Sequence, residues 1–211
     1  MWIKVFTFLI IKKILNHHKT CLIIATKIEA QSLFKNDNFD KVWKNESSSF
    51  YRGRKHDLLI TGIGPVCTAY ACGKISDLEH TQWLNLGIAG DLSQNHNISD
   101  IVQVGVCENW PAKNLLCRDL NTIKFDEGAK LITVSEPIHD ETMREKLSKL
   151  GQLVDMEGYA ISLSAQFSNK KLRISKVISD HANGKNIKNL VASIPKLMQQ
   201  LFESELDGFK K

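Results

Sequence analysis

Residues 154–158 read VDMEG, and residues 177–183 read VISDHAN. Each stretch starts with apolar residues and then turns acidic, with Asp155 and Glu157 in the first and Asp180 in the second. Short apolar runs bounded by turn residues are typical of buried strands. In open α/β sheets, ligands bind outside the carboxyl ends of the strands. The two stretches therefore predict a sheet with carboxylates at its ligand-binding edge.

The rest of the chain alternates between apolar runs and segments of helical character. Further strands are expected at residues 21–25, 57–64, 83–92, 100–109 and 130–138. Helices are expected at residues 27–34, 65–80, 140–150, 158–167 and 186–206, and the last should kink or break at Pro195. Polar residues 36–56 fit two short edge strands. This alternation predicts one α/β domain, with a mixed, largely parallel twisted sheet flanked by helices.

The composition is that of an ordinary globular protein, with 43% hydrophobic and 24% charged residues. The net charge of +5 is spread along the chain and predicts no nucleic-acid-binding surface. The five cysteines have no CxxC spacing and the seven histidines no paired metal-ligand spacing, so we expect neither a metal nor a cofactor. The cysteines fit buried thiols in a reducing compartment, which predicts a cytoplasmic protein.

Residues 1–19 read MWIKVFTFLIIKKILNHHK and precede the first predicted strand. Their apolar run is too short to span a bilayer, and it lacks the small-residue cleavage site of a signal peptide. We expect an N-terminal extension outside a core domain of residues 20–211, with no stable membrane insertion. A weak amphipathic helix at a membrane surface is the alternative.

Two glycine-containing motifs also follow predicted strands. TGIGPVC (61–67) has GxG spacing, but Cys67 stands where a dinucleotide-binding fingerprint has its third glycine. A turn that lets the backbone approach a ligand, or simply a tight turn, is the better interpretation. The segment from Gly87 to Gly90 is expected to form a second glycine turn at the same edge of the sheet.

Each acidic residue has a structural interpretation beside a functional one. Asp155 or Glu157 can stabilise a helix N-terminus, Asp180 can form an Asx turn, and Glu29 can lie solvated on a short helix. A carboxylate can also accept hydrogen bonds from both vicinal hydroxyls of a ribose. A buried carboxyl group can hold a proton near neutral pH and donate it. The residues alone leave both interpretations open.

Four segments together resemble, in order and spacing, the purine nucleoside phosphorylase/nucleosidase superfamily. They are ATKIEA (25–30), TGIGPVCTAY (61–70) with NLGIAGDL (85–92), VDMEGYA (154–160) and VISDHAN (177–183). Within the superfamily the chain looks most like the 5′-methylthioadenosine/S-adenosylhomocysteine nucleosidases, over roughly residues 20–205. The resemblance implies a mixed sheet flanked by helices, a purine nucleoside as ligand, cleavage of its N-glycosidic bond, and a homodimer.

The resemblance also implies roles for individual residues. Glu29 would activate the attacking water, Asp180 would protonate or hydrogen-bond the purine N7 atom, and Ser179 would orient Asp180. The residues that would hold the ribose or line the sugar and base pocket are Ala89, Gly90, Met156 and Glu157. Cleavage gives the sugar oxocarbenium character, and the base leaves more easily when it is protonated.

The chain departs from the family pattern in places. Ile88 stands for a serine and Lys176 for an arginine near the expected water site, and the segment Cys107–Leu131 is short. An aromatic residue that would stack on the purine is replaced in the region of Ile138 and His139. These departures affect the expected water site and the part of the pocket that would hold the 5′ substituent.

Three functions remain to be compared. A hydrolase would release adenine from 5′-methylthioadenosine, S-adenosylhomocysteine or aminofutalosine. A phosphorylase would need a phosphate dianion beside the anomeric carbon, and the acidic Glu29 would repel it. A nucleoside-binding protein without catalysis is the third possibility. The sequence favours the hydrolase.

Overall fold

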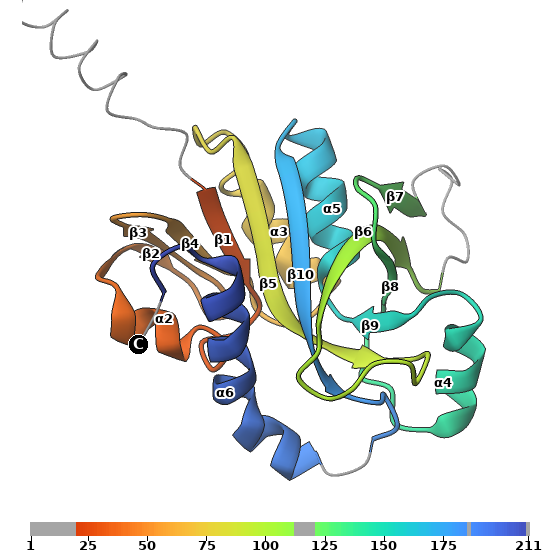
Figure 1. Ribbon diagram of the computed structural model, residues 1–211. Helices are drawn as coiled ribbons and strands as arrows, with labels where there is room; N and C mark the ends of the chain where they lie inside the picture. Colours follow the sequence, from red (N-terminus) through yellow and green to blue (C-terminus); the bar gives the residue numbers. More distant parts are fainter. Residues whose placement is uncertain (1–19, 112–120, 185–186, 210–211) are drawn as a thin grey trace, which may run out of the picture.

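The computed structural model describes residues 20–111, 121–184 and 187–209, so the expected extension at residues 1–19 lies outside the described residues (Figure 1). The strands are β1 (Thr20–Ile24), β2 (Phe39–Lys44), β3 (Ser49–Gly53), β4 (Asp57–Ile60), β5 (Gln82–Asp91), β6 (Ile101–Asn109), β7 (Thr122–Lys124), β8 (Ala129–Thr133), β9 (Leu153–Asp155) and β10 (Lys171–Asp180). The helices are α2 (Gln31–Asn36), α3 (Pro65–Gly73), α4 (Glu141–Ser148), α5 (Gly158–Phe167) and α6 (Ile187–Glu205).

The described strands form one sheet in the order β10-β6-β8-β9-β5-β1-β4-β3-β2, with β7 paired to β6. Strand β10 also pairs with β5, so β10, β6, β8, β9 and β5 form a closed circuit of five strands. Among the described pairings, five are parallel and five are antiparallel. The mixed α/β fold is confirmed, and its parallel pairings form two runs, β4-β1-β5-β10 and β6-β8-β9. The short connections between β2, β3 and β4 allow only antiparallel pairing there.

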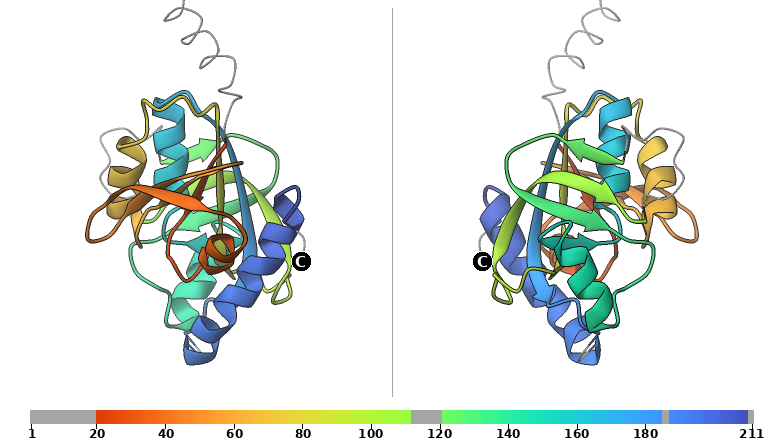
Figure 2. Two further views of the ribbon diagram at one scale, coloured as in Figure 1. Left: turned by 90° about the vertical axis from the view of Figure 1, so that its left-hand side faces the viewer. Right: turned by 90° about the vertical axis from the view of Figure 1, so that its right-hand side faces the viewer.

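Helices cover both faces of the sheet, with α6 on one side and α3 and α5 on the other (Figure 2). Strand β1 shows how the sequence serves both layers. Its Leu22 and Ile24 join the cluster with α6, whereas Cys21 and Ile23 join the cluster with α3 and α5. Successive side chains of a strand point to opposite faces, so a continuous apolar run is required where both faces are covered.

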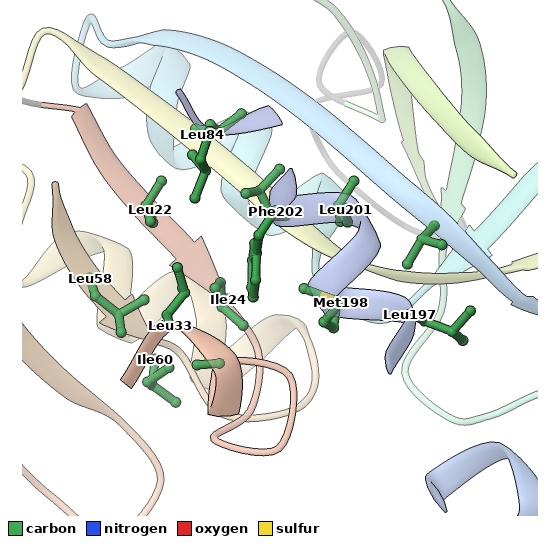
Figure 3. Packing of buried hydrophobic residues seen from close by; sticks show 14 of the residues in the cluster. Leu22, Ile24, Leu33, Leu58, Ile60, Leu84, Leu197, Met198, Leu201 and Phe202 are labelled. Atoms are coloured by element: carbon green, nitrogen blue, oxygen red, sulfur yellow. The ribbon is translucent and has the colours of Figure 1, made fainter. Parts of the chain in front are cut away.

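Helix α6 supplies the largest apolar stripe on its side of the sheet. Leu197, Met198, Leu201 and Phe202 are buried and lie over β5 and β10, in one apolar cluster with Leu22 and Ile24 of β1 (Figure 3). Their spacing places them on one face of a helix. The helix runs through Pro195, so the break expected at that residue is absent.

The structure corrects several predicted boundaries. The helix expected at residues 27–34 begins only at Gln31, because the Glu29 carboxylate accepts hydrogen bonds from Thr26 and stabilises a turn there. Helix α3 ends at Gly73, and β7 was not predicted. The glycine turn expected at residues 87–90 is instead part of strand β5. Gly87 and Gly90 do not form a turn; their lack of a side chain leaves room for neighbouring side chains to pack against the strand.

Among the described helices, none has the length and apolar character needed to cross a membrane.

Candidate active site

A cleft of about 390 Å³ lies at the carboxyl ends of β1, β5, β9 and β10. All seven residues predicted from the sequence line it: Glu29, Ala89, Gly90, Met156, Glu157, Ser179 and Asp180. They come from segments that are far apart in the chain, from Glu29 after the first strand to Asp180 at the end of the last. The expected convergence at one edge of the sheet is therefore present, while the chemical role of each residue stays a prediction.

Glu29 lies in the turn after β1 and is buried, with 4% of its surface exposed. Its Oε2 atom accepts hydrogen bonds from the backbone N and the Oγ1 of Thr26, both at 2.8 Å. Its Oε1 atom lies 3.4 Å from the backbone N of Ile88. Burial raises the pKa of Glu29, while the Thr26 hydrogen bonds and the charge of Lys176 oppose that rise. The surface-solvated interpretation of this residue is wrong.

Gly87 on β5 makes room for two charged side chains. A Cβ atom at Gly87 would lie 3.2 Å from the Nζ of Lys176 and 3.3 Å from the Oε1 of Glu29. Gly90 is similarly crowded, because a Cβ there would lie 3.2 Å from the Oδ1 of Asp180. A larger residue at Gly87 would displace Glu29 or Lys176, and a larger residue at Gly90 would displace Asp180.

The two acids of VDMEG have separate environments. Asp155 accepts hydrogen bonds from the backbone N of Gly158 at 2.8 Å and from the Oγ1 of Thr133 at 2.8 Å. Its Oδ2 atom also pairs with the Nζ of Lys176 at 2.9 Å. Asp155 thus holds the first turn of α5 and a buried cation, which is the structural interpretation. Capping explains this acid but not Glu157.

Glu157 is buried at the rim between β9 and α5. Its Oε1 atom accepts a hydrogen bond from the backbone N of Gly64 at 2.8 Å, and no described residue donates to Oε2. Burial raises the pKa of Glu157, the charge of Asp155 raises it further, and Lys176 opposes both. The carboxylate therefore has one oxygen fixed by the protein and one available to a ligand.

Lys176 is a buried cation beside the cleft acids, and the sequence identified it only as a departure from a family pattern. It is 2% exposed on β10, in the midst of the apolar run that predicts this strand. Burial alone lowers the pKa of a lysine, but the charges of Asp155, Glu157 and Glu29 outweigh it, so the pKa of Lys176 is raised. The signal in the sequence was a lysine inside a strand buried on both faces.

Asp180 lies where the pairing of β10 with β5 shifts register. Its Oδ2 accepts a hydrogen bond from Ser179 Oγ at 2.7 Å, and its Oδ1 accepts one from Ala182 N at 2.6 Å. Ser179 Oγ also lies 3.2 Å from the backbone O of Ala89. The contact that an orienting role of Ser179 requires is thus present.

The remaining wall of the cleft is mostly apolar. Sequence analysis missed the contributions of Ile63 and of helix α6, since neither belongs to an acidic motif. The apolar side chains concerned are Ile63, Val134, Pro137, Ile138, Leu190, Val191 and Ile194. No arginine or lysine is among the described residues that line the cleft, and no group of described residues is arranged to hold a metal ion.

No protein-family model and no curated protein sequence matches the chain. Solved structures do match it. One is a Helicobacter pylori methylthioadenosine nucleosidase (MTAN) variant with 5′-methylthioadenosine in its active site, at 16% identity and a TM-score of 0.79, covering 90% of this chain and 99% of that chain.

Two further solved structures extend the comparison. The futalosine hydrolase of Helicobacter pylori is 15% identical, with a TM-score of 0.75 over 87% of this chain and 93% of that chain. The 5′-methylthioadenosine/S-adenosylhomocysteine nucleosidase of Neisseria meningitidis, in complex with methylthio-immucillin-A, is 19% identical, with a TM-score of 0.72 over 89% and 100%. The chain therefore has the fold of the methylthioadenosine/S-adenosylhomocysteine nucleosidases, as its four motifs predicted.

Proposed function

We propose that the protein hydrolyses the N-glycosidic bond of a purine nucleoside and releases the base, with adenine as the expected product. The observation that supports this most is the convergence of Glu29, Glu157 and Asp180 on one cleft. Each carboxylate is held by hydrogen bonds from nearby backbone or hydroxyl groups. Three oriented carboxylates match the three tasks of the reaction, which are holding the sugar, protonating the base and activating water.

Glu157 holds the ribose. Its Oε1 atom is fixed by Gly64, and Oε2 remains to accept hydrogen bonds from the sugar hydroxyls. Met156 covers the sugar beside it, and Ala89 and Gly90 form the floor beneath. The same grip stabilises the sugar as it gains positive charge, because a carboxylate lies next to it.

Asp180 acts on the base. The carboxyl group donates a proton or a hydrogen bond to N7 as the glycosidic bond breaks, so that the purine leaves in neutral form. Ser179 and the backbone N of Ala182 fix the direction of this side chain. His139 and Ile138 line the same part of the cleft, where a purine ring would lie.

Glu29 activates the water that attacks the anomeric carbon. Two hydrogen bonds from Thr26 hold its Oε2 atom, and its Oε1 atom is directed toward β5 near Gly87. Burial raises the pKa of Glu29, which makes its carboxylate a stronger base toward water. The cation of Lys176 lies behind it and limits that rise.

A phosphorylase is the competing enzyme. It would need cationic side chains around a phosphate dianion. Lys176 is paired with Asp155 and does not line the cleft, whose described lining contains two glutamates and two aspartates. A phosphate dianion would be repelled there, which favours water as the attacking group.

We further propose that the nucleoside carries an apolar 5′ substituent, such as the methylthio group of 5′-methylthioadenosine. Ile63 and the α6 residues Leu190, Val191 and Ile194 line the cleft with apolar side chains. A thioether or alkyl group would be buried there, and each Å² of its apolar surface removed from water would contribute about 25 cal/mol to binding. The solved nucleosidases of this fold include complexes with 5′-methylthioadenosine and a methylthio inhibitor.

A homodimer through helix α3 is proposed as well. Val66 and Tyr70 lie one turn apart and are 81% and 56% exposed, and the nearby Ile63 is 60% exposed. Exposed apolar side chains that gather beside a cleft mark an interaction surface. A second copy of the chain would cover them. Analytical ultracentrifugation of Val66→Asp should show a monomer, and a wild type that sediments as a monomer would refute the dimer.

A cytoplasmic location is proposed from the thiols. Cys21, Cys67, Cys72 and Cys107 are free, and three of them are buried. Free thiols persist in reducing compartments.

The test of the function is an assay of base release from 5′-methylthioadenosine, S-adenosylhomocysteine, aminofutalosine, adenosine and inosine. Each is tested with and without phosphate. Release of adenine and free sugar without phosphate is the expected result. Phosphate-dependent release of a sugar 1-phosphate would select the phosphorylase, and tight binding without turnover would select a nucleoside-binding protein.

A further inference from the structure

We infer that the glycine turn of residues 61–65 is a positioning element for Glu157, and that the backbone N–H of Gly64 sets the direction of the ribose-holding carboxylate. This inference rests on the proposed function, because it concerns how that same site holds its nucleoside. It assigns a role to the TGIGP motif, whose sequence fitted either a ligand-binding turn or a simple tight turn.

The contact joins two segments that are far apart in the sequence. Gly64 N donates to Glu157 Oε1 at 2.8 Å across 93 positions, and the bond is buried. It connects the start of α3 to the start of α5, two helices that lie side by side on one face of the sheet. Because Glu157 has no other described hydrogen bond, this one decides where its second oxygen points.

The conformation of Gly64 is what aims its N–H at the carboxylate. Its φ of 91° and ψ of 159° lie in a region that is essentially restricted to glycine. A Cβ atom at Gly64 would meet nothing within 4 Å, so space does not demand a glycine there. Pro65 follows at the first turn of α3 and fixes the next φ. The backbone geometry alone therefore requires glycine at this position.

The charges around Glu157 increase the importance of its hydrogen bond from Gly64. The N-terminal N–H groups of a helix lack intrahelical partners and carry partial positive charge, so they favour an anion. Glu157 is buried beside the negative charge of Asp155, and the Gly64 hydrogen bond favours its ionised form. Without this bond the carboxylate would lose both a fixed direction and part of what keeps it charged.

The test removes the hydrogen bond without adding a side chain. An ester linkage in place of the amide between Ile63 and Gly64 replaces the N–H by an oxygen and keeps the residue free of a Cβ atom. The matched control is an ester between Cys72 and Gly73, which removes one backbone N–H of the same helix far from Glu157. Both proteins are compared in the wild-type and Glu157→Gln backgrounds.

Two affinities are measured by calorimetry for each protein. One ligand is free adenine, and the other is a carbon-linked adenosine analogue whose bond between sugar and base cannot be hydrolysed. The Gly64 ester should bind the analogue about 10-fold more weakly, with adenine affinity changed less than about 2-fold, as expected for one hydrogen bond to a charged group. The Gly73 ester should change neither affinity. In the Glu157→Gln background the Gly64 ester should have a smaller effect, because the amide oxygen can still accept the Gly64 hydrogen bond but no longer carries a charge.

The outcomes separate this inference from the proposed function. Equal losses for adenine and analogue, or a full effect that persists in Glu157→Gln, would overturn the positioning role even if the wild type releases adenine. If the wild type releases no adenine but the Gly64 ester still loses affinity for the analogue alone, hydrolysis is refuted and the positioning role is supported. Gly64→Ala and Gly73→Ala provide a second pair: the first should lower kcat/KM and the second should not.

Discussion

Two clusters of buried charge lie at opposite ends of the parallel strands. At the amino end, Asp57 begins β4 and is fully buried. Its Oδ2 atom accepts hydrogen bonds from Arg52 at 2.6 Å and pairs with His80 Nε2 at 2.9 Å, while Oδ1 lies 3.3 Å from the backbone N of Gly53. Both oxygens therefore have protein partners, and Asp57 is absent from the lining of the cleft.

The cluster at the carboxyl end is built differently. Glu29, Asp155 and Glu157 surround the single ammonium group of Lys176, and burial raises the pKa of both glutamates. Glu157 has an oxygen to which no described residue donates. A buried acid whose partners are complete stabilises the fold, whereas a buried acid left incomplete beside a cleft marks a ligand site. Substitutions at the two ends should therefore separate stability from activity.

The largest expected effect is that of Asp180→Asn. The amide cannot supply the proton that the leaving base needs, so turnover should fall about 100-fold or more. The melting temperature should change little, because the amide oxygen can still accept the hydrogen bond from Ala182 N, and the amide nitrogen can donate to the Ser179 hydroxyl. Adenine release is the measurement, and Asp126→Asn, at an exposed aspartate, is the control. Near-normal turnover in Asp180→Asn would remove the enzymatic interpretation of the cleft.

Glu29→Gln should lower turnover by about 100-fold, because the amide cannot take a proton from water. Adenine affinity should survive, since the proposed mechanism places Glu29 beside the attacking water rather than beside the base. The control is Glu46→Gln at an exposed position. If Glu29→Gln hydrolyses the nucleoside at a near-normal rate, the water site lies elsewhere. If it gains phosphate-dependent turnover, the repulsion argument against the phosphorylase is supported.

At the amino end, Asp57→Asn should lower the stability of the protein and leave its turnover nearly unchanged. It removes the charge that Arg52 and His80 share, and the free energy of unfolding should drop by about 1–3 kcal/mol. Arg52 is half-exposed, which limits its part of the loss. The kcat value should stay within about 2-fold of the wild type, because the cluster does not reach the cleft. Chemical denaturation and the adenine assay provide the two readouts, and a loss of kcat without a loss of stability would break the comparison.

Much of the fold and the cleft followed from local patterns. The apolar runs that became β1, β4, β5 and β10 were predicted from period and length, because these strands are buried on both faces. The convergence of Glu157 and Asp180 followed from a general rule, since the ends of parallel strands meet at one edge, whereas Glu29 was assigned to the site only by the family resemblance. The closed circuit was not predictable in this way, because it depends on β9, a strand of three residues.

The different environments of the two acids in VDMEG could not be predicted from the sequence. Asp155 and Glu157 are two positions apart, look equivalent and both line the cleft, yet both oxygens of Asp155 have protein partners, whereas one oxygen of Glu157 has no described donor. That difference depends on Lys176 and Gly64, which reach them from distant segments. The residues 87–90 read as a turn because glycine is common in turns, but here the glycines admit neighbouring side chains.

The smallest expected effect concerns Glu157, a buried acid with one oxygen that lacks a protein donor, and the stability that the protein loses when this acid ionises. Burial raises the pKa of Glu157 above its ordinary value of 4.5, so the folded state disfavours the ionised form. The stability that its protonated form contributes is present below pH 4.5 and is lost as the pH rises through the raised pKa. Glutamine cannot ionise and escapes this loss.

Glu157→Gln should therefore become more stable relative to the wild type as the pH increases. The difference in the free energy of unfolding should be small at about pH 4 and reach on the order of 1–3 kcal/mol at about pH 9. Urea denaturation across this range is the measurement, with Glu46→Gln as the exposed control. The loss of Glu157 removes a partner of Lys176, but Asp155 still pairs with that lysine at 2.9 Å and keeps it charged. A difference that is constant with pH, or that falls, would place Glu157 with Asp57 among the acids whose partners are complete.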